Sequence, residues 1–312
     1  MPELGPLRTV RTPTLDVAYH ALGPDDGRAA VLLHGFPYDV GSYRDVAPRL
    51  AAHGFRVIVP HLRGHGPTRF LREDAPRSGQ QAALGTDVVE LLDALHLEKA
   101  ILAGYDWGGR AACVAAAVWP ERVTGLVSVN GYLIQNIATA ELPLKADIEA
   151  GLWYFFYFLT ERGRTGLREN RRDIAEVIWR RNSPRRPLDA ALPDSMARSF
   201  DNPDYVDVVI HSYRHRLGHA DGAPEYERVE RLLAASPDIP VPAITLDGTA
   251  DGNFPATDGA ADAARFTGPR LHRQVADAGH HLPFEAPDAF VAAVRDVAAL
   301  AATRPTATTH GA

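Results

Sequence analysis

Residues 100–110 read AILAGYDWGGR, and this stretch decides the fold class. A short apolar run ends at Gly104, and the central Asp106 has a second glycine, Gly108, two positions after it. Glycines on both sides of one residue are typical of a strand that turns sharply into a helix and presents the central side chain. An aspartate that only capped the helix would need neither glycine. We therefore interpret Asp106 as a candidate nucleophile.

The composition is that of an ordinary globular protein, with 46% hydrophobic and 23% charged residues among 312 and a net charge of −6. The charges form no long run of one sign, so we expect no nucleic-acid or membrane partner. The single cysteine, Cys113, excludes an intrachain disulfide. The N-terminus lacks a secretory pattern and no apolar run reaches the roughly 18 residues of a membrane span, so we expect a cytoplasmic location.

Short apolar runs recur along the chain, and each ends near glycine, proline or a polar residue. They cover residues 29–33, 55–59, 100–104, 124–131, 241–248 and 270–277. Between them, residues 87–97 and 110–120 have the three- and four-residue spacing of apolar side chains that is typical of helices. Buried strands that alternate with helices predict an α/β fold, with a mostly parallel central sheet flanked by helices.

Residues 136–235 differ from the rest, because they are helical in pattern, aromatic and rich in arginine, with no clear strand. A helical insertion late in the sheet explains them, and it would lie over the carboxyl ends of the strands. We therefore expect a core at 1–135 and 236–303, a helical cap or lid at 136–235, and a disordered tail at 304–312.

The loops that follow four of the apolar runs should converge, because the carboxyl ends of parallel strands share one edge. These loops carry HGFP at 34–37, Asp106, Asp247 with Asp251, and His280 with His281. A nucleophile, then an acid, then a histidine is one of the chain orders that catalytic triads use. The residues themselves leave two candidates for the acid and two for the histidine.

Five motifs together resemble the aspartate-nucleophile branch of the α/β-hydrolase fold, and most closely the epoxide hydrolases. They are HGFP (34–37), RGHG (63–66), GYDWGG (104–109), GTAD (248–251) and GHHLPFEAP (279–287). The motif GxDWGG excludes the serine esterases and lipases, and the resemblance covers nearly the whole chain. It implies the α/β-hydrolase fold with an inserted helical cap.

The resemblance also implies roles for particular residues. Asp106 matches the nucleophile, His280 the base and Asp251, in GTAD, the acid that holds the base. The backbone N–H groups of Phe36 and Trp107 match the oxyanion hole.

Two cap tyrosines complete the pattern implied by the resemblance. Tyr154, in YFFYF, and Tyr213, in HSYRHR, match the pair that donates to the epoxide oxygen. The chain is then expected to hydrolyse a small apolar epoxide with water, giving a vicinal diol through an ester on Asp106. No cofactor or metal is implied, and a homodimer is possible.

Two other functions stay open at this point. A haloalkane or haloacetate dehalogenase would share the Asp-His-Asp triad, and Trp107 could cradle the halide. Haloacetate dehalogenases resemble this chain at Arg110 but need an arginine where it has Trp107. A non-catalytic ligand-binding homologue would use the pocket under the cap without chemistry.

Three histidines, His211, His215 and His219, lie four apart and could share one helix face. No carboxylate or cysteine joins this pattern, and Gly218 is expected to end the helix before His219. We therefore expect no metal site here.

Overall fold

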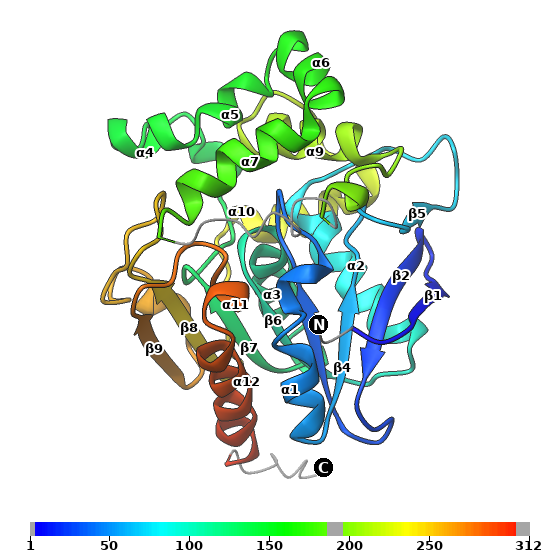
Figure 1. Ribbon diagram of the computed structural model, residues 1–312, viewed down its shortest axis with the longest axis vertical. Coiled ribbons are helices and arrows are strands. Elements are labelled where there is room, and N and C mark those ends of the chain that lie inside the picture. The colour runs from blue at the N-terminus through cyan, green and yellow to red at the C-terminus, as the bar shows by residue number, and fades with distance from the viewer. Residues whose placement is uncertain (1–3, 186–195, 304–312) are drawn as a thin grey trace, which may run out of the picture.

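A computed structural model of the chain describes residues 4–185 and 196–303. Over these residues nine strands form one sheet, in the order β1-β2-β4-β3-β6-β7-β8-β9, with β5 beside β2 (Figure 1). The strands are β1 (Leu7–Arg11), β2 (Leu15–Leu22), β3 (Arg28–Leu33), β4 (Phe55–Pro60), β5 (Arg69–Phe70), β6 (Ala100–Gly104), β7 (Val123–Val129), β8 (Ala243–Gly248) and β9 (Arg270–Val275).

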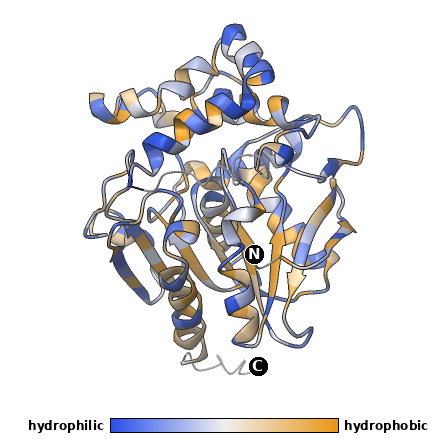
Figure 2. Cartoon of the chain, viewed as in Figure 1, coloured by the Kyte–Doolittle hydropathy of each residue, from blue (hydrophilic) through white to orange (hydrophobic). Residues whose placement is uncertain are grey.

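The sheet is parallel from β4 to β9, which confirms the predicted fold class. All six predicted apolar runs are strands. The antiparallel strands β1, β2 and β5 at the other edge were not predicted. Strands β3, β6 and β8 are buried almost throughout because helices cover both faces, and in Figure 2 the inner strands are correspondingly hydrophobic.

Helices cover both faces of this sheet. They are α1 (Ala47–Ala52), α2 (Gln81–Ala94), α3 (Asp106–Val118), α11 (Leu282–Glu285) and α12 (Pro287–Ala302). Helices α2 and α3 pack together on one face, whereas α1 and α12 contact each other on the opposite face. Alanines at positions such as 111, 112 and 115 of α3 are fully buried, and their small size allows the helix to approach the sheet closely.

The segment between β7 and β8 is helical, and we call its residues 136–235 the cap. It contains α4 (Ala146–Gly151), α5 (Trp153–Tyr157), α6 (Glu161–Glu169), α7 (Arg171–Asn182), α9 (Tyr205–Arg216) and α10 (Glu227–Ala234). Helices α4 to α7 and α9 lie beyond the carboxyl ends of the strands, whereas α10 packs on α2 and α3 (Figure 1). The indole of Trp179 on α7 donates to the carbonyl oxygen of Pro37 at 2.7 Å, which ties the cap to the HGFP loop.

No helix in the described ranges has both the length and the apolar character needed to cross a bilayer. The tail expected to be disordered, 304–312, lies outside the described residues.

Candidate active site

The turn between β6 and α3 depends on its glycines. Asp106 has a φ of 50°, a left-handed conformation that costs a residue with a β-carbon about 1–2 kcal/mol. A β-carbon on Gly108 would lie 2.0 Å from the carbonyl oxygen of Leu33, and one on Gly104 would lie 2.5 Å from Gly108. Larger residues would therefore force α3 away from β3, and Asp106 would leave the sheet edge.

The two carboxylate oxygens of Asp106 have different partners. Oδ1 accepts from the backbone N–H of Phe36 at 2.7 Å, whereas Oδ2 lies 3.6 Å from Nε2 of His280. Burial raises the pKa of Asp106, but His280 and the backbone N–H groups of Phe36 and Trp107 lower it further, so the net shift is downward. This carboxylate is therefore ionised at neutral pH, with Oδ2 facing the imidazole.

His280 lies between two carboxylates. Its Nδ1 is 2.8 Å from Oδ2 of Asp251, whose Oδ1 accepts from the backbone N–H groups of Asn253 and Phe254, both at 2.9 Å. Burial lowers the pKa of His280, but Asp251 and then Asp106 outweigh it and raise the pKa to about 10. The three expected triad side chains thus form one hydrogen-bonded and ion-paired row.

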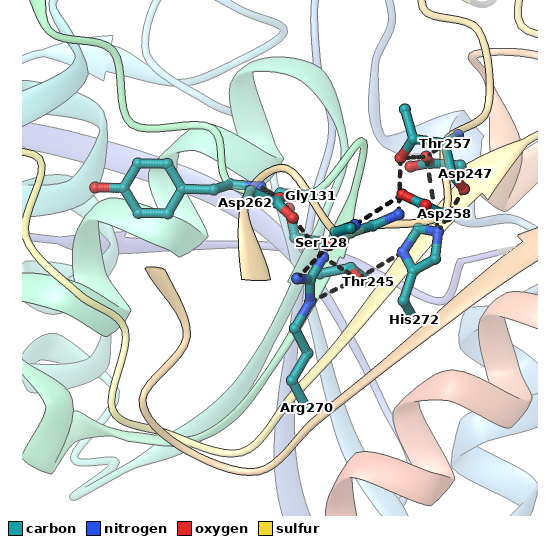
Figure 3. Close-up of polar contacts among 12 residues, drawn as sticks. Ser128, Gly131, Thr245, Asp247, Thr257, Asp258, Asp262, Arg270 and His272 are labelled. Atoms are coloured by element: carbon teal, nitrogen blue, oxygen red, sulfur yellow. Dashed lines mark hydrogen bonds and ion pairs between the residues drawn. The ribbon is translucent and has the colours of Figure 1, made fainter. Parts of the chain in front are cut away.

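The loop that carries Asp251 runs from β8 to β9, and a polar cluster between these two strands and the loop holds it in place (Figure 3). Arg270 donates to Oδ1 of Asp262 at 2.7 Å and to Oγ1 of Thr245 at 3.0 Å. The other oxygen of Asp262 accepts from the backbone N–H of Tyr132 at 2.7 Å. The cluster therefore joins the loop after β8 to the segment after β7.

Asp247 and His281, the other two candidates, do not contact Asp106. Oδ2 of Asp247 accepts from the backbone N–H and the hydroxyl of Thr257, both at 2.8 Å, and lies 3.9 Å from His272 (Figure 3). Nε2 of His281 lies 2.8 Å from Oγ of Ser42. Both side chains hold loops in place.

Tyr154 on α5 and Tyr213 on α9 lie against each other, with ring centroids 5.4 Å apart. Both rings also pack on Phe36, at 6.0 and 5.4 Å, and Tyr213 packs on Trp107 at 5.9 Å. Burial raises the pKa of both phenols, and the negative charge of Asp106 adds to this in each case. Both tyrosines therefore remain protonated at neutral pH.

One buried residue beside the site was quoted only as part of the RGHG motif. The imidazole of His65 packs on Trp107 at 6.0 Å and on Tyr205 at 5.2 Å, and its Nε2 has no hydrogen-bond partner among the described residues. Burial lowers the pKa of His65 to about 4, so this ring is neutral. Nothing in the spacing of RGHG indicates that the histidine would reach Trp107.

The three histidines spaced four apart do not share a helix. Helix α9 ends at Arg216, so His219 lies beyond it, while the rings of His211 and His215 stack at 5.7 Å. Within residues 4–185 and 196–303, no group of three histidine, cysteine or acidic residues is arranged to hold a metal ion.

A cavity of about 750 Å³ is lined mostly by residues of the cap. Its wall includes Leu152 and Phe155 from the cap and Phe254 from the loop after Asp251. The ring of Phe254 packs on His280 at 5.5 Å, so this one side chain connects the wall of the cavity to the carboxylate row.

Residues 31–287 match the family model of the α/β hydrolase fold. The chain belongs to this family. Epoxide hydrolase A of Mycobacterium tuberculosis is 27% identical over 87% of this chain and 90% of its own length. A crystal structure of a candidate epoxide hydrolase from Klebsiella pneumoniae is 47% identical, with a TM-score of 0.92 over 94% of this chain and 97% of that one. The resemblance to epoxide hydrolases seen in the motifs is therefore confirmed.

A second structure, of a candidate epoxide hydrolase from Pseudomonas aeruginosa, has a TM-score of 0.76 at 22% identity. It covers 94% of this chain and 97% of its own and shows a common fold.

Proposed function

We propose that the chain is an epoxide hydrolase, which converts an epoxide into a vicinal diol through a covalent ester on Asp106. The observation that carries this proposal is the pair of protonated phenols, Tyr154 and Tyr213, packed beside a buried and ionised carboxylate. A carboxylate can attack saturated carbon, and an alkoxide leaving group needs an acid, whereas a halide does not. The names of the relatives in Mycobacterium and Klebsiella also support the proposal.

In the first half-reaction, Oδ2 of Asp106 attacks one epoxide carbon and the carbon–oxygen bond of the ring breaks. Oδ1 is unsuited to attack because the N–H of Phe36 already holds it. Tyr154 and Tyr213 hydrogen-bond the ring oxygen, and one of them gives its proton to the alkoxide. Acid assistance of this kind contributes about 10²–10⁴-fold.

Before the second half-reaction His280 is an imidazolium, because its pKa is about 10. Ester formation removes the negative charge of Asp106, so the pKa of His280 falls and the imidazolium gives its proton to the tyrosinate left by the first half-reaction. The imidazole, held by Asp251, then takes a proton from water, and the oxygen of that water adds to the ester carbonyl. The N–H groups of Phe36 and Trp107 stabilise the oxyanion, each by about 3 kcal/mol.

Collapse of this intermediate breaks the bond between Cγ of Asp106 and the substrate oxygen and regenerates the carboxylate. One proton of the water goes to the departing diol oxygen, and the other stays on His280, whose pKa rises again beside the restored carboxylate. Every step uses groups of this chain and water, so the proposal includes no cofactor and no metal.

The test is to trap the ester. Replacement of His280 by alanine removes the base but leaves Asp106 able to attack, so incubation with styrene oxide should add one substrate mass to the protein. Peptide mass spectrometry should place the adduct on Asp106. An unmodified protein would contradict the covalent route and would favour a non-catalytic binding protein.

A second candidate, a dehalogenase, is favoured by one observation. The indole Nε1 of Trp107 is buried and has no acceptor of normal hydrogen-bond geometry in the described part of the chain. Such a donor next to Asp106 could hold a departing halide. Release of halide from haloalkanes or fluoroacetate, measured beside diol formation from epoxides, separates the two activities.

A further inference from the structure

Two arginines beside the active site are paired with amides rather than with carboxylates. Nη1 of Arg110 lies 3.4 Å from Oε1 of Gln81, and Nε of Arg216 lies 3.3 Å from Oε1 of Gln135. The two glutamines are themselves joined, because Nε2 of Gln81 donates to the carbonyl oxygen of Gln135 at 2.8 Å. Neither arginine has an ion pair with any carboxylate of residues 4–185 and 196–303.

One carboxylate, that of Glu230, contacts these amides, and it already accepts several hydrogen bonds. Glu230 on α10 accepts from the side-chain amides of Gln80 and Gln81 and from the backbone N–H of Ala82. Glu230 therefore accepts the hydrogen bonds offered by the first turn of α2. It does not form an ion pair with Arg110 or Arg216.

The two positive charges act on each other in a partly buried setting. Burial lowers the pKa of Arg110 to about 9, and the charge of Arg216 lowers it in the same direction, while Asp106 opposes both. Two like charges held close together without a carboxylate cost free energy, and a bound anion removes that cost. A negatively charged group close to these two arginines would therefore be stabilised by both of them.

Arg216 also lies at the wall of the large cavity. Its guanidinium stacks over the ring of Phe155 at 4.8 Å and over that of Tyr213 at 5.5 Å. It lines the cavity of about 750 Å³ and also a smaller hollow that it shares with Arg110. A negatively charged group bound by Arg216 would therefore lie close to Tyr213, one of the two proposed donors to the epoxide oxygen.

The other walls of the large cavity would not bind an anion so close to Tyr213. Leu152, Phe155 and Phe254 are apolar. The acidic residues among its lining, Glu141 and Glu149, repel anions, and the carboxylate of Glu149 accepts from the backbone N–H of Leu144 at 2.8 Å. The lining also includes His219, but Arg216 carries the permanent positive charge that lies over the ring of Tyr213, at 5.5 Å.

We propose that Arg216, supported by Arg110, binds a carboxylate group of the substrate, so that the preferred substrate is an epoxide carrying a carboxylate a few bonds from the ring. This inference rests on the proposed epoxide hydrolase function and adds the substrate class. Arg216 anchors the carboxylate while Asp106 attacks the ring, and the anchor fixes which ring carbon is presented.

The test compares epoxides that differ only in charge. Terminal epoxyalkanoates of increasing chain length and their primary amides are assayed with the wild type, Arg216→Gln, Arg110→Gln and the matched control Arg214→Gln. Arg214 is on the same helix but pairs with Glu161 at 2.8 Å. For the best chain length, the ratio of kcat/KM for the carboxylate to that for the amide should fall about 10- to 100-fold in Arg216→Gln.

In Arg216→Gln the loss of kcat/KM for the carboxylate should be mainly an increase in KM. Arg110→Gln should show a smaller loss in the same direction. Arg216→Lys should restore part of the kcat/KM that Arg216→Gln loses. The ratio for Arg214→Gln should equal that of the wild type. A ratio that is unchanged in Arg216→Gln overturns the carboxylate site. Thermal unfolding of each variant shows whether it has folded, and the lysine variant keeps the test decisive if the glutamine variant has not.

A binding measurement separates this proposal from the proposed function. Calorimetric titration with saturated alkanoates of the same lengths requires no turnover. Alkanoate binding that depends on Arg216, in a protein that opens no epoxide, supports the carboxylate site and contradicts the epoxide hydrolase. Diol formation together with no alkanoate binding to the wild type supports the enzyme and overturns the carboxylate site.

Discussion

Replacement of Asp251 by asparagine should stop the second half-reaction while leaving the first in place. Both backbone donors of the loop, the N–H groups of Asn253 and Phe254, are bonded to Oδ1 of Asp251. An asparagine should therefore keep its carbonyl oxygen on that side and turn its NH₂ group toward His280. Nδ1 of the imidazole must then accept, and the ring proton moves to Nε2, so Nε2 can no longer take a proton from water.

The size of the effect follows from the same geometry. The carboxylates around His280 raise its pKa from 6.5 to about 10, and Asp251 is the larger contributor. This rise corresponds to about 5 kcal/mol of stabilisation of the imidazolium. Loss of Asp251 lowers the pKa of His280 and fixes the wrong tautomer, so steady-state diol formation should fall about 10³-fold. The attack by Asp106 should still be complete within the first turnover.

Rapid-quench kinetics with mass spectrometry can measure both half-reactions. Asp251→Asn should give a burst of about one ester per active site and then a slow phase. Asp247→Asn is the matched control, because Asp247 lies at the end of β8, just before the loop of Asp251, but bonds to Thr257, and it should give no ester burst. The reasoning is refuted if Asp251→Asn turns over within a few-fold of the wild type, or if its rate falls and no ester accumulates.

The remaining predictions concern the nucleophile, the phenols and acid stability. Asp106→Asn removes the attacking carboxylate, so diol formation should be lost. Tyr154→Phe and Tyr213→Phe should each slow ester formation about 10- to 100-fold, and the double variant at least 10³-fold, in single-turnover assays. Burial lowers the pKa of His61 to about 3 and of His65 to about 4. The unfolded chain therefore binds protons that the folded chain excludes, and urea titrations should show stability falling below about pH 6.5. These two residues together contribute up to about 3 kcal/mol per pH unit, and His34 and His281, whose pKa values burial also lowers, steepen the fall.

Each of these three predictions can be contradicted by a specific result. Near-normal diol formation by Asp106→Asn would exclude the covalent mechanism. Tyr157→Phe is the control for the phenols, since Tyr157 lies in the same helix α5 but does not pack on Phe36, and an equal loss in all three single variants would indicate packing effects only. An unfolding free energy that stays constant from about pH 7.5 to 5 would show that buried histidines do not govern acid stability.

The sheet was predictable wherever both of its faces are covered. Strands such as β3 and β6 are apolar at nearly every position because helices lie on both sides, and that pattern is visible in the sequence. The edge strand β1 is mostly exposed, so its five residues form no apolar run and gave no signal. The antiparallel edge of the sheet was therefore missed.

The candidate site was predictable only in part. The position of Asp106 follows from its flanking glycines, which prevent clashes with the backbone of β3. Spacing could not separate Asp251 from Asp247, because Asp247 ends the apolar run of β8 and Asp251 lies in the loop directly after it. The difference lies in which backbone groups the loop offers to each carboxylate. The roles assigned to Tyr154 and Tyr213 came from the resemblance and remain predictions.

Arg216 gave no signal in the sequence, because a basic residue in the last turn of a helix is common on electrostatic grounds. Its partners come from segments far apart in the chain, Gln135 before the cap helices and Phe155 on α5. Only the folded arrangement reveals that its charge faces the cavity.

The cap leaves the sheet after β7 and returns to β8, and these two strands pair directly, with Leu126 beside Ala243. The hydrogen bonding of the sheet is thus complete beneath the cap whatever the length of the inserted segment. Asp106, His280 and Asp251 lie outside the cap, whereas Tyr154, Tyr213 and Arg216 lie within it. Replacing the cap of one relative by the cap of another should therefore transfer the substrate preference of the donor protein. The nucleophile and its base would still be those of the protein that receives the cap.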